Sequence, residues 1–379
     1  MKKVLITGGA GFIGSALCKR LLKGGYEVIV LDNLSPQIHG DQPEKTSPLF
    51  QSIHDQVKFI RGDVNREQDW LTAMQDVDVI VHLAAETGTG QSMYQIKRYT
   101  DVNIGGTALL LDLLARRESR VRKVVIASSR SVYGEGRYYA QELNRHVYPN
   151  HRSPDDMDKG DFEVKYPGCK LPLQLVPTDE ESLVHPSSLY GITKQCQEQL
   201  VMTMCPALGI VPVAFRYQNV YGPGQSLRNP YTGILSIFST LVRTEKEINI
   251  FEDGKESRDF VFVDDAVEAT FLGITRQEAD GQVFNVGTGV AVDVLTVAKT
   301  LMQSYGKQVP LRVSGNYRLG DIRHNIADIS RIERLLGFKV SVSFADGIKK
   351  FSEWVTTQEV GQGKYEESIQ EMQARGLFK

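Results

Sequence analysis

Tyr190 and Lys194 are four positions apart, so on a helix both side chains project from one face and can point at the same spot. A free tyrosine, with a pKa of about 10, is a poor base at neutral pH, but a fixed ammonium group favours its phenolate form. Such a pair can take a proton from a hydroxyl group and return it. For an isolated pair, an exposed tyrosine beside a solvated lysine is the alternative, because this spacing is common by chance.

A glycine-rich turn near the N-terminus could hold a pyrophosphate. The apolar run at 4–7 leads into Gly8, Gly11 and Gly14, and a helix-like stretch follows. Gly8 permits a tight turn, Gly11 lets the backbone approach the phosphates, and Gly14 lets the helix pack closely on the strand. The motif is weak alone, because glycine-rich turns occur in many loops.

The ends of the next three apolar runs supply a second dinucleotide signal. Asp32 ends the second run at the distance, roughly 20 residues, where a carboxylate accepts hydrogen bonds from the adenosine ribose. An acid here repels a 2′-phosphate and no arginine follows it directly, so the pattern favours NAD over NADP. Asp63 and Val64 are placed to meet the adenine, although Asp63 is equally well explained as a turn or helix-capping residue. The small residues of 83–85 end the fourth run beside the cofactor.

The element order predicts how these groups are positioned. Short apolar runs at 4–7, 28–32, 57–63, 77–85, 123–129 and 211–217 alternate with helix candidates that include 13–23, 66–75 and 102–117. This order is typical of an α/β fold, a Rossmann-like doubly wound parallel sheet with ligands at the carboxyl ends of its strands.

The domain organisation follows from where this order stops. We expect residues 1–218 to form the NAD-binding domain and 219–379 to form a smaller mixed α/β substrate lobe, with 259–289 returning to the first domain. Residues 134–186 are rich in Pro, His, Tyr and charge, and they are far longer than a usual connection of ~4 to 6 residues. We interpret them as an insertion that acts as a lid or as an interface element.

Composition excludes several classes of partner. The 44 basic and 46 acidic residues give a net charge of −2, so we expect no nucleic-acid partner and no electrostatic attraction to a membrane surface. No apolar run approaches the roughly 18 residues of a membrane-spanning helix. The four cysteines form no CxxC motif, which indicates a reducing compartment and favours a cytoplasmic location.

Taken in order, the motifs resemble those of the extended short-chain dehydrogenase/reductase family, in its nucleotide-sugar epimerase and dehydratase branch. The resemblance covers nearly the whole chain and rests on TGGAGFIG (7–14), GDV (62–64), HLAA (82–85), SSRSVYG (128–134), YGITK (190–194), RYQNVYGPG (216–224), RDFVFVDD (258–265), NVGTG (285–289) and RLGDIRHNIAD (318–328). It implies an enzyme with bound NAD and a nucleotide-diphosphate sugar as substrate.

The resemblance also implies roles for single residues. Tyr190 takes the proton of a sugar hydroxyl, Ser129 steadies that oxygen, and Lys194 activates the tyrosine while NAD accepts the hydride. Further cofactor contacts are implied for Gly8, Gly11, Phe12, Ile13, Gly14, Asp32, Asn33, Asp63, Val64, Leu83, Ala84, Ala85, Asn103, Ser128 and Tyr217. Substrate contacts are implied for Thr87, Ser129, Arg130, Asn219, Arg258, Arg318 and Asp321, with the last three arranged around the phosphates and ribose.

The residues after Ser129 bear on the reaction. Relatives that remove water carry Asp and Glu there, whereas this chain has Arg130 and Ser131, which favours epimerisation at C4. Stretches 85–93 and 225–238 resemble those of dTDP-L-rhamnose 4-epimerases, which make dTDP-6-deoxy-L-talose. UDP-hexose 4-epimerase, nucleotide-sugar dehydratase or dehydrogenase, and non-catalytic NAD-binding protein remain alternatives.

Two further expectations come from the same branch. Its insertion often carries a cysteine metal knuckle, but here only Cys169 is present in that stretch, so we expect no metal. The helices expected near 102–117 and 187–204 resemble those that pair subunits in the family, which favours a homodimer.

Overall fold

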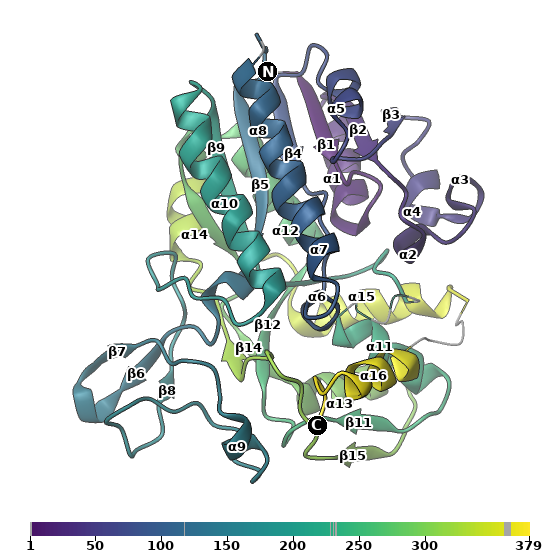
Figure 1. The fold of residues 1–379 in the computed structure, drawn as a ribbon. Helices are drawn as coiled ribbons and strands as arrows, with labels where there is room; N and C mark the ends of the chain where they lie inside the picture. Colours follow the sequence, from purple (N-terminus) through teal and green to yellow (C-terminus); the bar gives the residue numbers. More distant parts are fainter. Residues whose placement is uncertain (1, 117, 228, 230, 232, 360–364) are drawn as a thin grey trace.

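The computed structural model describes residues 2–116, 118–227, 229, 231, 233–359 and 365–379 (Figure 1). Its centre is a sheet in the order β13-β9-β5-β4-β1-β2-β3, in which every neighbouring pair is parallel. These strands are β1 (Lys3–Thr7), β2 (Glu27–Asp32), β3 (Lys58–Arg61), β4 (Val79–His82), β5 (Lys123–Ser129), β9 (Val211–Tyr217) and β13 (Val283–Val286). The predicted Rossmann-like parallel sheet is confirmed.

Helices cover both faces of this sheet, because the strands are apolar on both sides. Val4 and Ile6 belong to the core with α1 (Phe12–Lys23) and α12 (Val263–Thr275), whereas Leu5 belongs to the core with α8 (Gly106–Arg116) and α10 (Leu189–Ala207). Shorter helical segments in this half are α2 (Pro36–His39), α3 (Pro43–Thr46), α4 (Pro48–Gln51), α5 (Glu67–Ala73), α6 (Thr89–Ser92), α7 (Ile96–Tyr99), the π-helical Thr100–Gly105 and the 3-10 turns Arg130–Tyr133 and Gln277–Ala279.

The second lobe lies beyond the carboxyl ends of these strands (Figure 1). It contains a mixed sheet, a parallel two-stranded sheet of β11 with β15, and several helices. The mixed sheet is made of β10 (Asn219–Tyr221), β12 (Ser257–Phe262), β14 (Ala291–Asp293) and β16 (His324–Asn325). The other elements are β11 (Ile248–Ile250), β15 (Leu311–Val313), α11 (Ile234–Arg243), α13 (Val294–Tyr305), α15 (Phe344–Thr356) and α16 (Tyr365–Ala374). Helix α14 (Ser330–Leu336) returns to the first domain and packs near β13 and α12 (Figure 1).

The long insertion forms a subdomain beside both lobes (Figure 1). Its antiparallel strands are β6 (Tyr138–Ala140), β7 (Arg145–Val147) and β8 (Gln174–Leu175), accompanied by the 3-10 turn Gln141–Leu143 and α9 (Pro154–Met157). Tyr138, Val147 and Val164 form a small apolar core of its own. Its last part is tied to the second lobe, since Thr178 donates its backbone N–H to Ile326 O.

Within the described parts of the chain, no helix combines the length and the apolar character that a membrane crossing requires.

Candidate active site

A cavity of about 620 Å³ lies at the carboxyl ends of the parallel strands, under the second lobe. Every residue predicted for the site lines it, with the exception of Asn103. The structure therefore brings residues as far apart in sequence as Gly8 and Asp321 around one space. This is where ligands bind in open parallel sheets.

The glycine turn at one end of the cavity is shaped to receive phosphates. Gly8 has φ +67°, and a Cβ at Gly14 would lie 2.3 Å from Gly8 O, so only glycine fits there. A Cβ at Gly11 would lie 3.1 Å from the same oxygen. No side chain caps the N-terminus of α1 behind Gly11, which leaves that helix end to an anion. These residues fit a dinucleotide.

Asp32 ends β2 at the same end of the cavity. Its side chain is 8% exposed and is held by the backbone N–H groups of Leu34 (2.8 Å) and Ala10 (3.0 Å). Burial raises the pKa of Asp32, while the N–H donor of Leu34 and the nearby His39 oppose that rise. The carboxylate is thus fixed at the rim where an adenosine ribose would lie.

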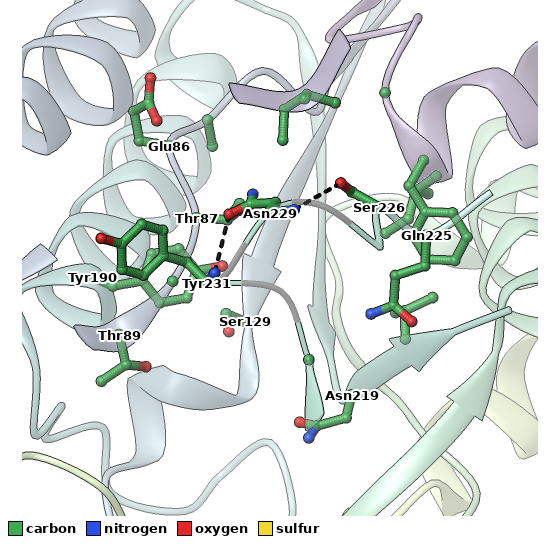
Figure 2. A pocket seen from close by; sticks show the side chains of 18 of the residues that line it. Glu86, Thr87, Thr89, Ser129, Tyr190, Asn219, Gln225, Ser226, Asn229 and Tyr231 are labelled. Atoms are coloured by element: carbon green, nitrogen blue, oxygen red, sulfur yellow. Dashed lines mark hydrogen bonds between the residues drawn. The ribbon is translucent and has the colours of Figure 1, made fainter. Parts of the chain in front are cut away.

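Tyr190 and Ser129 both line the cavity (Figure 2). Ser188 caps the start of α10 by accepting from Gly191 N, and this places Tyr190 on the first turn. Burial raises the pKa of Tyr190, whereas the nearby Ser129 hydroxyl and the charge of Arg130 lower it. The position of the phenol is suited to proton exchange.

Ser131 orients the Ser129 hydroxyl. Ser129 Oγ accepts from both the backbone N–H (3.2 Å) and the hydroxyl (2.9 Å) of Ser131. With its oxygen occupied by two donors, the hydroxyl has its own hydrogen to donate. That hydrogen can be shared between Tyr190 and a substrate oxygen.

Lys194 lies one helical turn after Tyr190 and is buried. Its Nζ donates to Gln197 Oε1 at 2.8 Å. Burial lowers the pKa of Lys194 to about 7, and the carboxylate of Glu198 acts in the opposite direction. Glu198 in turn forms a bidentate ion pair with Arg216 (2.6 and 3.0 Å), which anchors α10 to β9.

The far end of the cavity carries the predicted substrate residues. Arg318 donates to the Asp321 carboxylate at 2.8 Å, and its guanidinium lies 5.4 Å from the centre of the Phe251 ring. Arg258 is directed at backbone carbonyls of the same loop. Cationic groups, a carboxylate and an aromatic ring suit a nucleotide diphosphate.

Asn103 differs from the prediction. It is fully buried, accepts from Glu86 N at 2.8 Å, and donates to Glu86 O at 3.1 Å and to Thr193 Oγ1 at 2.9 Å. Its amide is therefore used to hold the loop after β4 against α10. We revise its role from a cofactor contact to a support of the cavity wall.

For the insertion, the structure contradicts one of the two interpretations, the lid. None of its described residues, 134–186, lines the cavity, so in this structure it is not a lid. It packs against the second lobe instead, as an interface element would. Cys169 has no disulfide partner.

One acidic cluster in the described residues has a spacing suited to a metal ion. Carboxylate oxygens of Glu252, Asp253 and Glu256 lie within 4.8 Å of one another. However, Arg323 forms ion pairs with Glu252 (3.0 Å) and Asp253 (2.7 Å), so a guanidinium already neutralises much of this charge. The absence of a metal remains a prediction.

The comparison with protein families matches residues 4–154 and 166–287 to the NAD dependent epimerase/dehydratase family. This chain belongs to that family. This confirms three expectations: the family, the dependence on NAD, and the class of nucleotide-sugar epimerases.

Individual relatives extend along nearly the whole chain. A dTDP-L-rhamnose 4-epimerase from Burkholderia thailandensis is 36% identical over 94% of this chain and 96% of its own length. A UDP-glucose 4-epimerase from Mycolicibacterium smegmatis is 31% identical over 93% of this chain and 98% of its own. The crystal structure of UDP-glucuronic acid 4-epimerase from Bacillus cereus, in complex with UDP-glucuronic acid and NAD, matches with a TM-score of 0.76 and 27% identity over 94% and 99% of the two chains.

Two parts of this epimerase/dehydratase-family site were missed from the sequence. Gln218 lines the cavity with neither amide atom hydrogen-bonded, although it directly follows the sixth predicted strand. Helix α16 contributes Tyr365, Ser368 and Met372, none of which is among the site residues expected from the sequence. The spacing i, i+3, i+7 of these three residues was the available signal for a helix face.

Asp32→Asn tests the cofactor end of the site. The substitution keeps the shape but removes the charge that accepts from ribose hydroxyls, so we expect NAD to bind roughly 10-fold more weakly. The preference for NAD over NADP should also fall, because the repulsion of a 2′-phosphate is lost. Fluorescence titration with both cofactors checks this, with exposed Asp55→Asn as the control. An unchanged NAD/NADP ratio would show that Asp32 does not select the cofactor.

Proposed function

We propose that this enzyme inverts the configuration at C4 of a nucleotide-linked hexose, and that dTDP-L-rhamnose, giving dTDP-6-deoxy-L-talose, is its substrate. The observation that carries the proposal is that Tyr190, Ser129 and Lys194 line one cavity together with the glycine turn and Arg318. The similarity to the Burkholderia thailandensis protein supports the choice of sugar.

The chain's own residues provide proton handling and positioning. The turn at 8–14, Asp32 and Lys194 would hold NAD, which when bound supplies a reversible hydride acceptor. Tyr190 takes the proton from the C4 hydroxyl and later returns it, while the Ser129 hydroxyl holds the oxygen in place. Arg318 and Asp321 would hold the nucleotide, so that the sugar alone can turn between the two halves of the reaction.

The groups after Ser129 argue against loss of water. Arg130 Nε donates to Asn219 Oδ1 at 2.8 Å, and Ser131 is used to orient Ser129. Burial, and next the charge of Arg258, lower the pKa of Arg130 to about 9, which still leaves a cation at neutral pH. A cation and a hydroxyl cannot act as the carboxylate acid and base of a dehydratase.

UDP-hexose 4-epimerase is the second candidate, supported by the similarity to the Mycolicibacterium smegmatis protein. The deciding experiment incubates the NAD-loaded protein with dTDP-L-rhamnose, UDP-glucose or UDP-galactose and follows the sugar H4 couplings by NMR. We expect an equilibrium of two C4 epimers from dTDP-L-rhamnose without net NADH. Steady NADH release would indicate a dehydrogenase, and a 6-deoxy-4-keto product from UDP-glucose would indicate a dehydratase.

A further inference from the structure

The loop that carries Asp321 is held at three consecutive backbone carbonyls by arginine side chains. Arg152 Nη2 donates to Asp321 O at 3.0 Å. Arg258 donates to Ile322 O at 2.7 Å and to Arg323 O at 2.9 Å. Three charged donors on consecutive carbonyls fix the backbone of this loop. One of the two arginines, Arg152, comes from the insertion.

Arg152 also holds a second segment of the cavity wall. Its side chain is 2% exposed and forms a bidentate ion pair with Glu252, with 2.8 Å for each of the two hydrogen bonds. Glu252 lines the cavity beside Phe251 and has φ +48°, a left-handed conformation that a non-glycine residue adopts only when its surroundings hold it there. A single guanidinium thus joins the Asp321 loop to the strand end that carries Phe251.

Two other residues of the insertion, Glu135 and Glu163, contact Arg323 in the loop that carries Asp321. Glu135 is 1% exposed, and its Oε2 accepts from Arg323 N at 2.7 Å, which fixes the next part of the loop. Glu163 pairs with the fully buried guanidinium of Arg323 at 2.7 Å. Because Glu163 itself is 59% exposed, the buried part of this contact is the hydrogen bond that Glu135 accepts from Arg323 N. The contact between the insertion and the loop is therefore firm.

We propose that the insertion, residues 134–186, positions the nucleotide-binding end of the cavity from behind, and that Arg152 is its central positioning residue. The proposal rests on the proposed function, because it takes Arg318 and Asp321 to hold the nucleotide. Without Arg152 the loop and Glu252 are joined only by the ion pair of Arg323 with Glu252, and nucleotide binding must then order them further. The hydrogen bonds and ion pairs of Arg152 go to Glu135, Phe162, Glu252 and Asp321, away from the pair at the reacting carbon.

The test compares Arg152→Met and Arg152→Lys with Arg137→Met. Arg137 is the matched control, since it belongs to the insertion but donates only within it, to Pro177 O and Asp179. Calorimetry with dTDP and with UDP on the NAD-loaded protein measures nucleotide binding without turnover. NMR rates on the sugar nucleotide that the wild-type enzyme epimerises give kcat and KM separately.

For Arg152→Met we expect the Kd of the nucleotide and the KM to rise about 10-fold or more, the scale of a lost charged hydrogen-bond pair, with kcat within about twofold of wild type. The Kd and KM of Arg152→Lys should lie between those of Arg152→Met and wild type, and Arg137→Met should have the wild-type values. Unchanged nucleotide affinity in Arg152→Met overturns the inference, as does a fall in kcat alone. If Arg152→Met does not fold, the same criteria apply to Arg152→Lys. Failure of the wild-type enzyme to bind either nucleotide would instead reject the proposed function.

Discussion

Tyr190→Phe is expected to lower kcat about 1000-fold while NAD stays bound, which is the largest effect on activity that the structure predicts. The phenyl ring fills the same space, so the cavity keeps its shape, but no group is left to exchange a proton with the sugar hydroxyl. Removal of a positioned acid or base typically costs 10²- to 10⁴-fold. NMR rates give kcat, and absorbance of the cofactor released on denaturation gives the NAD content.

Tyr139→Phe serves as the control for this experiment. Tyr139 lies in the insertion strand β6, outside the cavity, and donates its hydroxyl hydrogen to Asn144. It should retain wild-type kcat. If Tyr190→Phe retained more than about a tenth of the wild-type rate, the tyrosine would not be the proton-exchanging group, and the assignment of Ser129 as its partner would fall with it.

Lys194→Met is expected to have opposite effects on activity and on stability. Activity should fall by about 100-fold or more, because the methionine carries no charge to favour the Tyr190 phenolate. In NAD-free protein, however, the free energy of unfolding should increase, because the wild-type fold buries a cation. Burial lowers the pKa of Lys194 to about 7 from an ordinary value of 10.5.

The pH dependence of this stability gain follows from the direction of the shift. Below pH 7 Lys194 is protonated in both states, and the folded state bears the full cost of the buried charge. Between pH 7 and about 10.5 the folded state releases the proton before the unfolded state does, so the cost declines as pH rises. The increase in Tm for Lys194→Met should therefore be larger at pH 6 than at pH 9.

Thermal unfolding of NAD-free protein at both pH values checks this, with Lys19→Met as the control at an exposed position of α1. Part of the gain is offset, since Gln197 Oε1 loses the hydrogen bond from Lys194. A lower Tm for Lys194→Met at pH 6 would contradict a buried, destabilising cation. An equal gain at both pH values would show that packing rather than charge is responsible.

The parts of the site that the sequence predicted consist of residues that lie close together in the sequence. The glycine turn, the carboxylate ending β2 and the i, i+4 pair on α10 each lie within one strand–turn–helix unit, where local geometry places the side chains. The parallel strand order then brings their carboxyl ends to one edge, so cofactor and chemistry could be located before any contact was known.

Other features depended on segments meeting across the fold. Whether Asn103 faces the cavity or the loop after β4 depends on Glu86 and Thr193, which approach it from two other segments. The same holds for α16, which reaches the cavity from a segment far along the chain from the parallel sheet. Local periodicity contains no information on such partners.

The insertion shows most clearly which features the sequence determines and which only the tertiary structure decides. Its composition and length marked it as an unusual segment, and nothing in its own residues chose between lid and interface. That choice was made by the buried ion pair between Arg152 and Glu252 and by the buried hydrogen bond from Arg323 N to Glu135, which form only when segments distant in sequence pack together. A buried charge must have a counter-charge next to it in space. That partner can lie anywhere in the sequence, so the sequence alone does not show which residues pair.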